Sequence, residues 1–250
     1  MNLTPQKGLI VIPAYNEEQN IARVLERVRA AGNEEEILVI NDGSKDRTRQ
    51  VLESLGAKHV NHPVNLGYVR ALQTGIRFAA ERDYEYLIFI DGDGQHDPNE
   101  IRDLKAKGLA EGGPDVVIGS RFIKDQGYKA PLGRKMGMLL FSWLTGVVGG
   151  KRIYDTTSGF KLLRRRAYAL VCEQIYGDFH AEMIIFSLIA GLRIEEVPIV
   201  VAQREFGVSM YNWLSSLLYP VKTILAISVL WVQARKERRA FEAAAARGAA

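Results

Sequence analysis

Cysteine is nearly absent from this sequence of 250 residues, and its scarcity excludes two kinds of site. The single cysteine, Cys172, lies in an apolar stretch with helical spacing. One cysteine forms neither an intramolecular disulfide framework nor a cysteine-based metal centre, and a protein without disulfides is expected in a reducing compartment. Residues 1–7 also lack the apolar core of a secretion signal, so a cytoplasmic location is expected.

A strong excess of one charge is also missing. The 33 basic and 29 acidic side chains leave a net charge of +4, which is too small to indicate a nucleic-acid-binding protein. Basic residues cluster only locally, at 164–166 and again between Arg235 and Arg239. The histidines show no metal-ligand spacing and are interpreted as incidental; they are His59, His62, His96 and His180.

Short apolar runs alternate with stretches of helical spacing through the first half of the chain. The runs at 9–12, 37–40 and 86–90 predict buried strands. In the first helical stretch Asn16 is the expected N-cap and Gly32 the end. Further strands are expected at 58–61, 116–118 and 192–201, and a further helix at 67–81. This alternation predicts an α/β fold with a mainly parallel sheet.

The most informative segment is 91–97, which follows one of these buried runs. It delivers the carboxylates of Asp91 and Asp93 and the amide of Gln95 to a strand's carboxyl end, the edge at which open α/β sheets bind ligands. Oxygen ligands of this kind suit Mg²⁺ or Mn²⁺ together with substrate phosphates. The alternative is a solvated acidic turn in which Asp97 caps a helix beginning at Pro98. Such a cap requires none of the other side chains, so a metal-held nucleotide diphosphate is favoured.

Taken in order, six segments of this sequence resemble glycosyltransferase family 2, and within it the polyprenyl-phosphate glycosyltransferases of the dolichol-phosphate mannose synthase type. A single pair of spaced aspartates would be weak support, whereas ordered segments are specific. They are residues 11–18, 39–44, 91–96, 119–122, 155–160 and 203–209. The resemblance implies the GT-A fold, a Rossmann-like, mainly parallel sheet flanked by helices.

The resemblance also implies roles for residues on the nucleotide side. The end of the first strand would frame the base and ribose through Pro13, Tyr15 and Glu17. Asp42 would accept a hydrogen bond from the base, although Asp42-Gly43 is also a plain turn dipeptide. The metal and the diphosphate would be held by Asp91, Asp93 and Gln95, with Asp93 counted among the catalytic residues. At the next family segment, Tyr68 and Val69 depart from the expected pattern.

On the acceptor side, the resemblance implies a catalytic carboxylate at Asp155, with Glu182 as a rival and a turn or N-cap aspartate as the alternative. A guanidinium fork binds phosphate oxygens in a bidentate manner. The side chains expected around phosphates and the acceptor are Arg121, Arg134, Ser158, Arg204 and Ser209, with Lys135 able to assist Arg134. Met210 replaces a lysine that the family pattern would place there.

The C-terminal region has a different pattern. Residues 211–232 carry an apolar stripe opposite a polar face, and Pro220 interrupts them. This pattern favours kinked amphipathic helices in a membrane interface, with the basic residues 235–239 facing anionic headgroups. The alternative is a core-packing pair or a dimerising pair in a homo-oligomer. We expect a catalytic domain at 1–210, interface helices at 211–240 and a disordered tail at 241–250.

The sequence therefore predicts an inverting, metal-dependent hexosyltransferase that moves a sugar from a nucleotide diphosphate to a polyprenyl phosphate. Mg²⁺ or Mn²⁺ is the expected cofactor, and the expected location is the inner face of the membrane. Two alternatives stay open: transfer to a sugar hydroxyl of a growing polysaccharide, and a catalytically silent nucleotide-sugar-binding subunit. The sugar, the base (GDP-mannose or UDP-glucose type), the prenyl chain length and the oligomeric state are not fixed by the sequence.

Overall fold

The computed structural model describes residues 8–123, 132–172 and 180–202, together with 231–232, 234–236 and 238–239. Side chains are described from residue 137 onward in the second of these ranges. Residues 211–230 of the interface helices expected at 211–240, and the tail expected at 241–250, lie outside the described residues. Within the described ranges, no helix is both long and apolar enough to cross a bilayer.

The described strands form one seven-stranded sheet in the order β3-β2-β1-β4-β6-β5-β7. Pairing is parallel except at β6, which runs antiparallel to both β4 and β5. The bounds are β1 Gly8–Ala14, β2 Glu36–Asn41, β3 His59–Asn61, β4 Tyr86–Phe89, β5 Val116–Ser120, β6 Lys161–Arg164 and β7 Ile194–Pro198. The mainly parallel α/β sheet expected from the sequence is confirmed, with β6 as the antiparallel exception.

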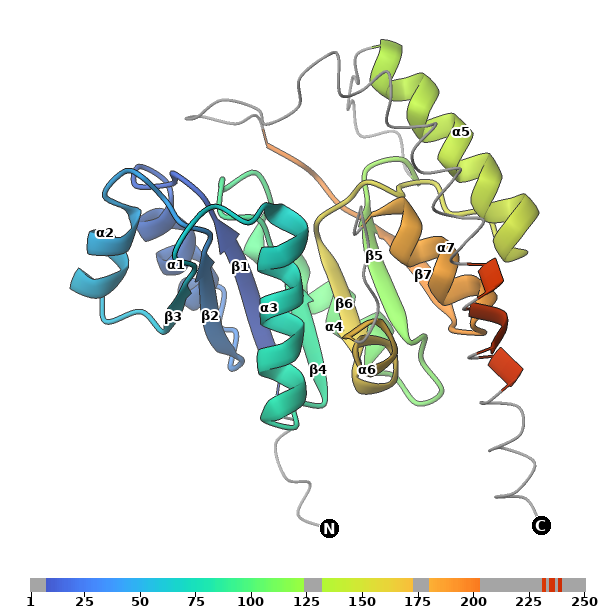
Figure 1. Cartoon of the computed structure of the whole chain (residues 1–250), viewed down its shortest axis with the longest axis horizontal. Helices are drawn as coiled ribbons and strands as arrows, with labels where there is room; N and C mark the ends of the chain where they lie inside the picture. The colour runs from blue at the N-terminus through green and yellow to red at the C-terminus, as the bar shows by residue number, and fades with distance from the viewer. Residues whose placement is uncertain are drawn as a thin grey trace.

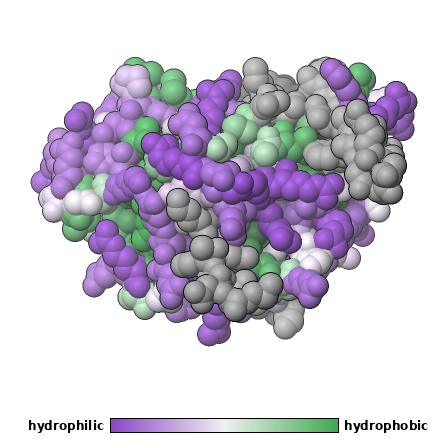
Figure 2. All heavy atoms as spheres, turned by 90° about the horizontal axis from the view of Figure 1, so that it is seen from below, coloured by the Kyte–Doolittle hydropathy of each residue, from purple (hydrophilic) through white to green (hydrophobic). Residues whose placement is uncertain are grey.

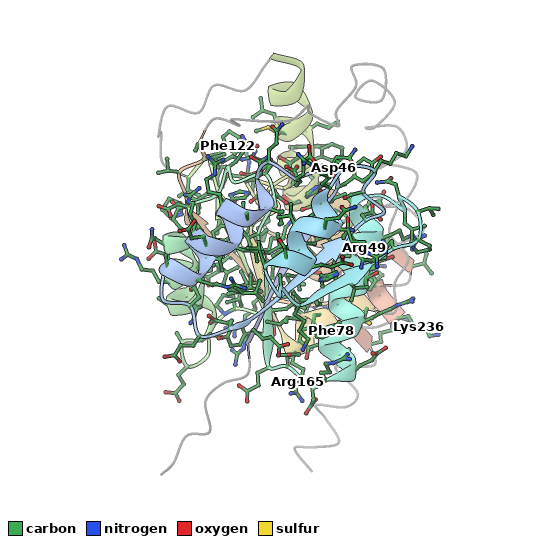
Figure 3. The ribbon with its side chains drawn as sticks, turned by 90° about the vertical axis from the view of Figure 1, so that its left-hand side faces the viewer. Asp46, Arg49, Phe78, Phe122, Arg165 and Lys236 are labelled. Carbon is green, nitrogen blue, oxygen red and sulfur yellow. The ribbon has the colours of Figure 1, made fainter. Side chains whose placement is uncertain are left out.

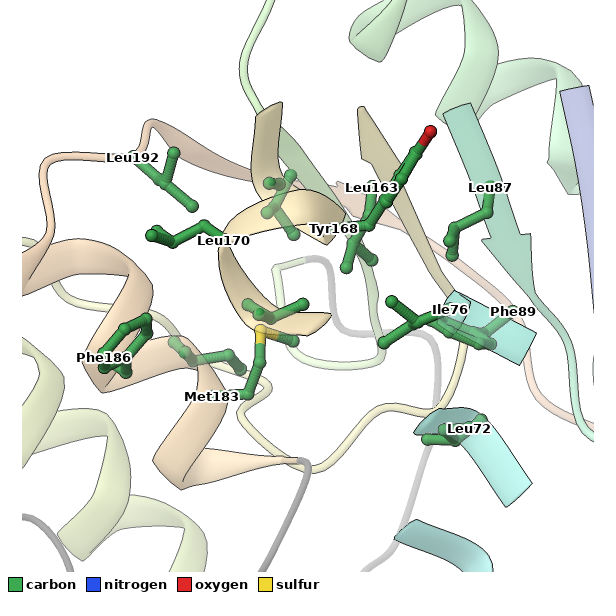
Figure 4. Close-up of a cluster of buried hydrophobic side chains, with 14 of the residues drawn as sticks. Leu72, Ile76, Leu87, Phe89, Leu163, Tyr168, Leu170, Met183, Phe186 and Leu192 are labelled. Atoms are coloured by element: carbon green, nitrogen blue, oxygen red, sulfur yellow. The ribbon is translucent and has the colours of Figure 1, made fainter. Parts of the chain in front are cut away.

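Helices cover both faces of this sheet (Figure 1). Their bounds are α1 Ile21–Ala30, α2 Thr48–Ser54, α3 Tyr68–Glu81, η1 Pro98–Glu100, α4 Ile101–Gly108, α5 Leu132–Gly149, α6 Arg165–Cys172 and α7 Ala181–Ile189. On one face, side chains of α3 and α6 pack with alternate residues of β1 and β4, and α7 joins the same buried cluster beside α6. Figure 4 shows this cluster with Leu87 and Phe89 of β4. On the other face, α1, α2 and α4 pack against the intervening residues, such as Ile10 and Ile12 of β1.

Two helix starts were expected from the sequence, and one expectation is wrong. Asp97 does cap the turn at Pro98, since its carboxylate accepts a hydrogen bond from the Asn99 backbone. Asn16 does not cap α1, which begins at Ile21 after Asn20. The Asn16 backbone instead adopts a left-handed conformation with φ of 56°, and its side chain accepts from the backbone N–H of Lys45 at 2.8 Å. It thus joins the loops after β1 and β2.

The loops after the parallel strands meet at one end of the molecule. Asp46, in the loop after β2, and Phe122, in the loop after β5, lie toward this upper end, whereas Phe78 and Arg165 lie toward the lower end (Figure 3). Hydrophilic side chains cover much of the lower face, where the parallel strands begin (Figure 2). The candidate site residues that follow β1, β2, β4 and β5 are therefore gathered at the opposite, carboxyl edge.

The close approach of α3 to β1 requires a glycine. A Cβ at Gly75 would lie 2.5 Å from Cγ1 of Val11, and a valine side chain has little freedom to move away. We expect Gly75→Val to lower the free energy of unfolding by about 1–3 kcal/mol through overpacking. Gly137→Val is the matched control, because a Cβ at Gly137 meets nothing within 4 Å. Urea unfolding of both variants checks this, and equal stabilities would contradict the packing argument.

Candidate active site

The site is built around the turn that follows β4. Asp91 and Asp93 are half-buried, and the Asp93 carboxylate accepts a hydrogen bond from the Gln95 backbone at 3.1 Å. The Gln95 side chain donates to the Ala202 carbonyl at 3.0 Å, and the Ala202 N–H donates back to the Gln95 carbonyl at 2.9 Å. The structure thus brings all of these predicted ligands into one turn and attaches that turn to the segment after β7.

The Asp91 carboxylate receives a hydrogen bond on each oxygen. The Tyr68 hydroxyl donates to Oδ1 at 2.9 Å, and Nε2 of His96 lies 3.3 Å from Oδ2. Burial alone would raise the pKa of Asp91, but the interactions with His96 and Tyr68, with a smaller contribution from His180, lower it to about 2. The site therefore presents Asp91 as a carboxylate throughout the physiological pH range.

The loop at 155–160 passes directly against this carboxylate. A Cβ at Gly159 would lie 2.6 Å from Oδ2 of Asp91 and 2.7 Å from the Tyr68 hydroxyl, so only a glycine fits here. Phe160 continues the contact by stacking on the His96 ring, with centroids 5.1 Å apart. Because Asp155 begins the same loop, the predicted metal-binding turn and the predicted acceptor carboxylate are joined by one short segment.

Asp155 is fully buried and paired with Arg121. Nε and Nη2 of Arg121 donate to the two carboxylate oxygens at 2.7 and 2.8 Å, and the Arg121 backbone N–H donates at 3.0 Å. Burial would raise the pKa of Asp155, but these hydrogen bonds and the Arg121 charge hold it below its usual range. The Arg121 fork expected around phosphates is thus directed at a protein carboxylate, and its phosphate role stays a prediction.

Glu196 of β7 fixes the start of this loop. Its carboxylate accepts from the backbone N–H of Tyr154 at 2.9 Å and from that of Asp155 at 2.8 Å. At the other end of the loop, the buried amino group of Lys161 donates to the Ser158 carbonyl. Ser158 is itself buried, with its hydroxyl accepting from the Phe160 N–H at 3.2 Å. The loop is therefore held by β7 on one side and by β6 on the other.

Asp42 organises a second loop. Its carboxylate accepts from the backbone N–H groups of Leu66 and Gly67 at 2.9 and 2.8 Å, and from the Asn65 amide at 3.1 Å. Nδ1 of His62 lies 2.6 Å from the same carboxylate. Hydrogen-bond partners from the chain itself thus surround the Asp42 carboxylate, which was expected to bind the nucleotide base. A base contact would have to displace one of them, and this role stays a prediction.

The remaining nucleotide-side residues lie at the end of β1. Pro13 is buried in the strand, and its carbonyl oxygen packs against Gly92, where a Cβ would lie only 2.8 Å away. Glu17 is buried, accepting from the Asn20 amide at 2.6 Å, while its backbone N–H donates to Thr48. Tyr15 between them is half-buried. The structure brings this strand end beside the turn after β4.

Several predicted acceptor-side residues lie outside the described side chains. Arg134 and Lys135 lie in the first turn of α5, but their side chains are outside the described residues, as are Arg204, Ser209 and Met210 entirely. The described range 180–202 ends at Ala202, which is hydrogen-bonded to Gln95. Glu182, the rival carboxylate, is buried in the first turn of α7.

Residues 9–171 match the sequence profile of the family described as Glycosyl transferase family 2. The chain belongs to glycosyl transferase family 2. It is 34% identical over 212 residues to an undecaprenyl-phosphate mannosyltransferase of Micrococcus luteus, covering 80% of this chain and 86% of the relative. It is 28% identical over 221 residues to a UDP-N-acetylglucosamine–dolichyl-phosphate N-acetylglucosaminyltransferase of Methanococcus voltae, covering 80% and 87%.

The fold of this family 2 glycosyltransferase is similar to that of a solved structure. Glucosyl-3-phosphoglycerate synthase of Mycobacterium tuberculosis, with Mn²⁺ and UDP-glucose bound, superposes with a TM-score of 0.67 at 21% identity. The match covers 89% of this chain and 79% of that one. At this identity the likeness establishes the shared GT-A fold, and the fold predicted from the sequence is confirmed.

The residues around Asp91 fit a divalent cation that would be bound partly by the protein and partly by a substrate. In the part of the chain that the structure describes, no three His, Cys, Asp or Glu side chains converge to hold a metal. Two carboxylates and an amide oxygen would leave the other positions to diphosphate oxygens and water, which is how Mg²⁺ is usually bound beside phosphates. Asp91, Asp93 and Gln95 are thus the residues that would hold the ion in this glycosyltransferase.

Sequence reasoning missed several members of the site. His62 and His96 are not incidental, since each lies against one of the aspartates, and Nδ1 of His96 is buried with no hydrogen-bond partner among the described residues. Tyr68 departs from the family pattern, yet it donates to Asp91. Lys161 and His180 are buried nearby, with Nζ and Nδ1 3.5 Å apart. The adjacency of His96 to the Asp91 turn was the only local signal available.

The Asp155–Arg121 pair predicts a pH-dependent stability. Because the folded pKa of Asp155 lies below its unfolded value near ~3.9, its contribution is fully present above that value and is lost as pH falls through the folded pKa. We expect Asp155→Asn to lower the free energy of unfolding at pH 7 by about 3–5 kcal/mol, because Arg121 keeps an uncompensated charge. The difference from the unmodified protein should shrink below about pH 4.

Urea unfolding at a series of pH values measures this difference. Asp103→Asn is the matched control, because the Asp103 side chain is 52% exposed and pairs with its neighbour Arg102 on the surface of α4. Its effect should stay within about 0.5 kcal/mol. A constant difference for Asp155→Asn down to pH 3 would show that the pair does not depress the pKa of Asp155.

Proposed function

We propose that this family 2 glycosyltransferase is an inverting, metal-dependent hexosyltransferase that transfers a sugar from a nucleotide diphosphate to a polyprenyl phosphate. The observation that carries the proposal is the loop at 155–160, in which Gly159 packs on Asp91 and Asp155 pairs with Arg121. One loop thereby joins the donor-side carboxylates to the acceptor side. The Micrococcus luteus and Methanococcus voltae relatives, whose names specify lipid-phosphate acceptors, support this substrate class.

On the donor side, the chain would bind and orient the nucleotide diphosphate. Asp91 keeps its negative charge at neutral pH and would hold a divalent ion together with Asp93 and Gln95. When bound, Mg²⁺ or Mn²⁺ would neutralise charge that develops on the departing diphosphate. The loops after β1 and β2, joined through Asn16 and Lys45, would form the surface for the base and ribose. Stabilisation of this developing charge by preorganised groups is expected to contribute most to catalysis.

On the acceptor side, no strong general base is needed. A phosphate monoester has its second pKa near ~6 and is mostly ionised before it attacks from the face opposite the leaving group. Asp155 is buried and its pKa is held low by Arg121, which makes it a poor proton acceptor and a good orienting group. A sugar-hydroxyl acceptor would require a true general base, so this pairing favours the phosphate acceptor over the polysaccharide alternative.

A membrane surface is part of the proposal. Leu139, Trp143 and Val147 of α5 are 53%, 56% and 63% exposed, and their spacing places them along one side of the helix. Near the end of α5, the guanidinium of Arg235 lies 3.7 Å from the centroid of the Trp231 ring, which is itself 39% exposed. Exposed apolar side chains beside cations fit an anionic lipid surface, where the prenyl chain of the acceptor would reside.

The metal-dependent reaction is tested with a panel of nucleotide sugars. The protein is mixed with a short prenyl phosphate and with GDP-mannose, UDP-glucose or UDP-N-acetylglucosamine, and the glycolipid product is detected by mass. We expect one donor to react only with Mg²⁺ or Mn²⁺ present. Asp93→Asn should lower the rate about 100- to 1,000-fold, because the amide keeps the shape of the side chain but loses its charge.

Two controls accompany this panel. Asp103→Asn, on the surface of α4, should keep full activity, and the Asp93→Asn protein should unfold at the same urea concentration as the unmodified chain. Full activity of Asp93→Asn, or of the unmodified protein in EDTA, would contradict the metal assignment. Metal-dependent nucleotide-sugar binding without transfer to any acceptor would instead support the silent-subunit alternative.

The membrane contact is tested by sedimentation with vesicles of phosphatidylcholine and phosphatidylglycerol. We expect the double variant Trp143→Ser, Val147→Ser to bind about tenfold more weakly, because it removes apolar area that would enter the interface. Transfer to a short, soluble prenyl phosphate should be unchanged. Leu55→Ser is the control, since Leu55 is 41% exposed at the end of α2. Equal binding of the double variant and the control would show that α5 is not the membrane-facing element.

A further inference from the structure

We propose that Tyr68 is a positioning residue for Asp91, and that Asp42 controls the orientation of Asp91 through Tyr68. This inference rests on the proposed function, because it concerns the carboxylate that would hold the metal ion. It adds to that function a chain of contacts running from the loop after β2, through the start of α3, to the turn after β4.

The first contact is the hydrogen bond from the Tyr68 hydroxyl to Oδ1 of Asp91, at 2.9 Å. The Tyr68 ring is held by stacking on His180 at the start of α7, with centroids 5.5 Å apart and planes inclined by 18°. Gly159 closes another side, because a Cβ there would meet the hydroxyl at 2.7 Å. The hydroxyl therefore has a defined position, and it fixes one oxygen of the carboxylate.

The second contact, made by Asp42, fixes the position of Tyr68. Tyr68 is the first residue of α3, and the residue before it, Gly67, has φ of 93°. This left-handed turn is held by Asp42, whose carboxylate accepts the backbone N–H groups of both Leu66 and Gly67. A carboxylate that accepts backbone N–H groups at the beginning of a helix is favourably placed relative to the helix dipole. Asp42 thus determines how α3 begins.

A side-chain contact ties the same carboxylate to the body of α3. His62 lies between Asp42 and Thr74, with its ring nitrogens 2.6 Å from the carboxylate and 2.9 Å from the Thr74 hydroxyl. Thr74 lies in the second turn of α3. Loss of the Asp42 charge would therefore loosen the start of the helix at two points, and the Tyr68 hydroxyl would lose its fixed distance to Asp91.

Both oxygens of the Asp91 carboxylate are engaged by other side chains, and this fixes its orientation. Tyr68 engages Oδ1 and His96 engages Oδ2, so the plane of the carboxylate is defined before a ligand arrives. Outer partners of metal ligands usually account for about 10- to 100-fold in metal affinity. Tyr68 departs from the residue that the family pattern predicts, and it would orient Asp91, a metal ligand that the family resemblance implies.

The experiment measures Mn²⁺ binding by electron paramagnetic resonance, with UDP and GDP in separate arms. We expect Tyr68→Phe to weaken Mn²⁺ binding about 10- to 100-fold in whichever arm the unmodified protein binds. Tyr86→Phe is the matched control: its hydroxyl also donates to a carboxylate, Oε1 of Glu35 at 2.7 Å, but at the opposite end of β4. This control should bind Mn²⁺ as the unmodified protein does.

Asp93→Asn separates this inference from the proposed function. If Asp93→Asn loses Mn²⁺ binding and Tyr68→Phe binds normally, the positioning role of Tyr68 is overturned and the metal site stands. If Asp93→Asn also binds normally, the metal site of the proposed function is wrong. Equal weakening by Tyr86→Phe and Tyr68→Phe would mean that general destabilisation, and not position, explains the loss.

A double-mutant cycle tests the part played by Asp42. Asp42→Asn should weaken Mn²⁺ binding in the unmodified protein but add little in the Tyr68→Phe background, because both changes break the same chain of contacts. If the two losses multiply, Asp42 acts on the ligand independently of Tyr68, as a direct contact to the base would, and this part of the inference is overturned.

Discussion

Carboxylates that are fully or partly buried need hydrogen-bond donors, and the arrangement of the site depends on how the chain supplies them. An unpaired charge in a protein interior is costly, yet Asp42, Asp91 and Asp155 all lie at the carboxyl edge of the sheet. Each receives at least one donor from a segment far away in the sequence: the loop before α3 for Asp42, Tyr68 for Asp91, and Arg121 just after β5 for Asp155. Satisfying the carboxylates therefore also brings the loops together.

Glycine makes this convergence possible at two points. Gly92 lets the turn after β4 approach the carbonyl of Pro13, and Gly159 lets the acceptor-side loop approach Asp91. A Cβ would lie 2.8 Å from the Pro13 carbonyl oxygen at position 92 and 2.6 Å from Oδ2 of Asp91 at position 159, so a larger residue at either position would require the loops to move apart. The antiparallel direction of β6 completes the arrangement, since it allows the loop at 155–160 to reach the sheet from the same edge at which β4 ends.

Local pattern explains which parts of this structure were predictable. The apolar runs and helical spacing of residues 9–90 gave the parallel strands, and the clustered oxygens at Asp91, Asp93 and Gln95 gave the turn. The strand β6 was not predicted, because it begins at a buried lysine and ends at an arginine, which hides its apolar centre. The 18-residue helix α5 was also missed; its several glycines resemble a loop more than a helix.

The contacts between distant residues were beyond sequence reasoning for a different reason. Tyr68 and Asp91 are both polar residues at the ends of elements, and nothing in their spacing predicts that they meet. The departure of Tyr68 from the family pattern indicated a missing contact, whereas in the structure the tyrosine makes a new one. Partners of this kind depend on how α3 is seated on β1 at Gly75, which is a property of the packed fold.

The Asp155–Arg121 pair also bears on which acceptor the site suits. Under the proposed reaction the acceptor arrives as an anion, and at a separation of 4 Å two like charges repel by roughly 4 kcal/mol at an effective dielectric of about 20. An unpaired Asp155 would oppose such an acceptor. Paired with Arg121, it forms a nearly neutral unit that still presents fixed dipoles, so it orients an anion without strong repulsion. A neutral hydroxyl acceptor is not repelled by Asp155, so the pairing with Arg121 would not help it to bind. The pairing would also weaken Asp155 as the general base that a hydroxyl requires.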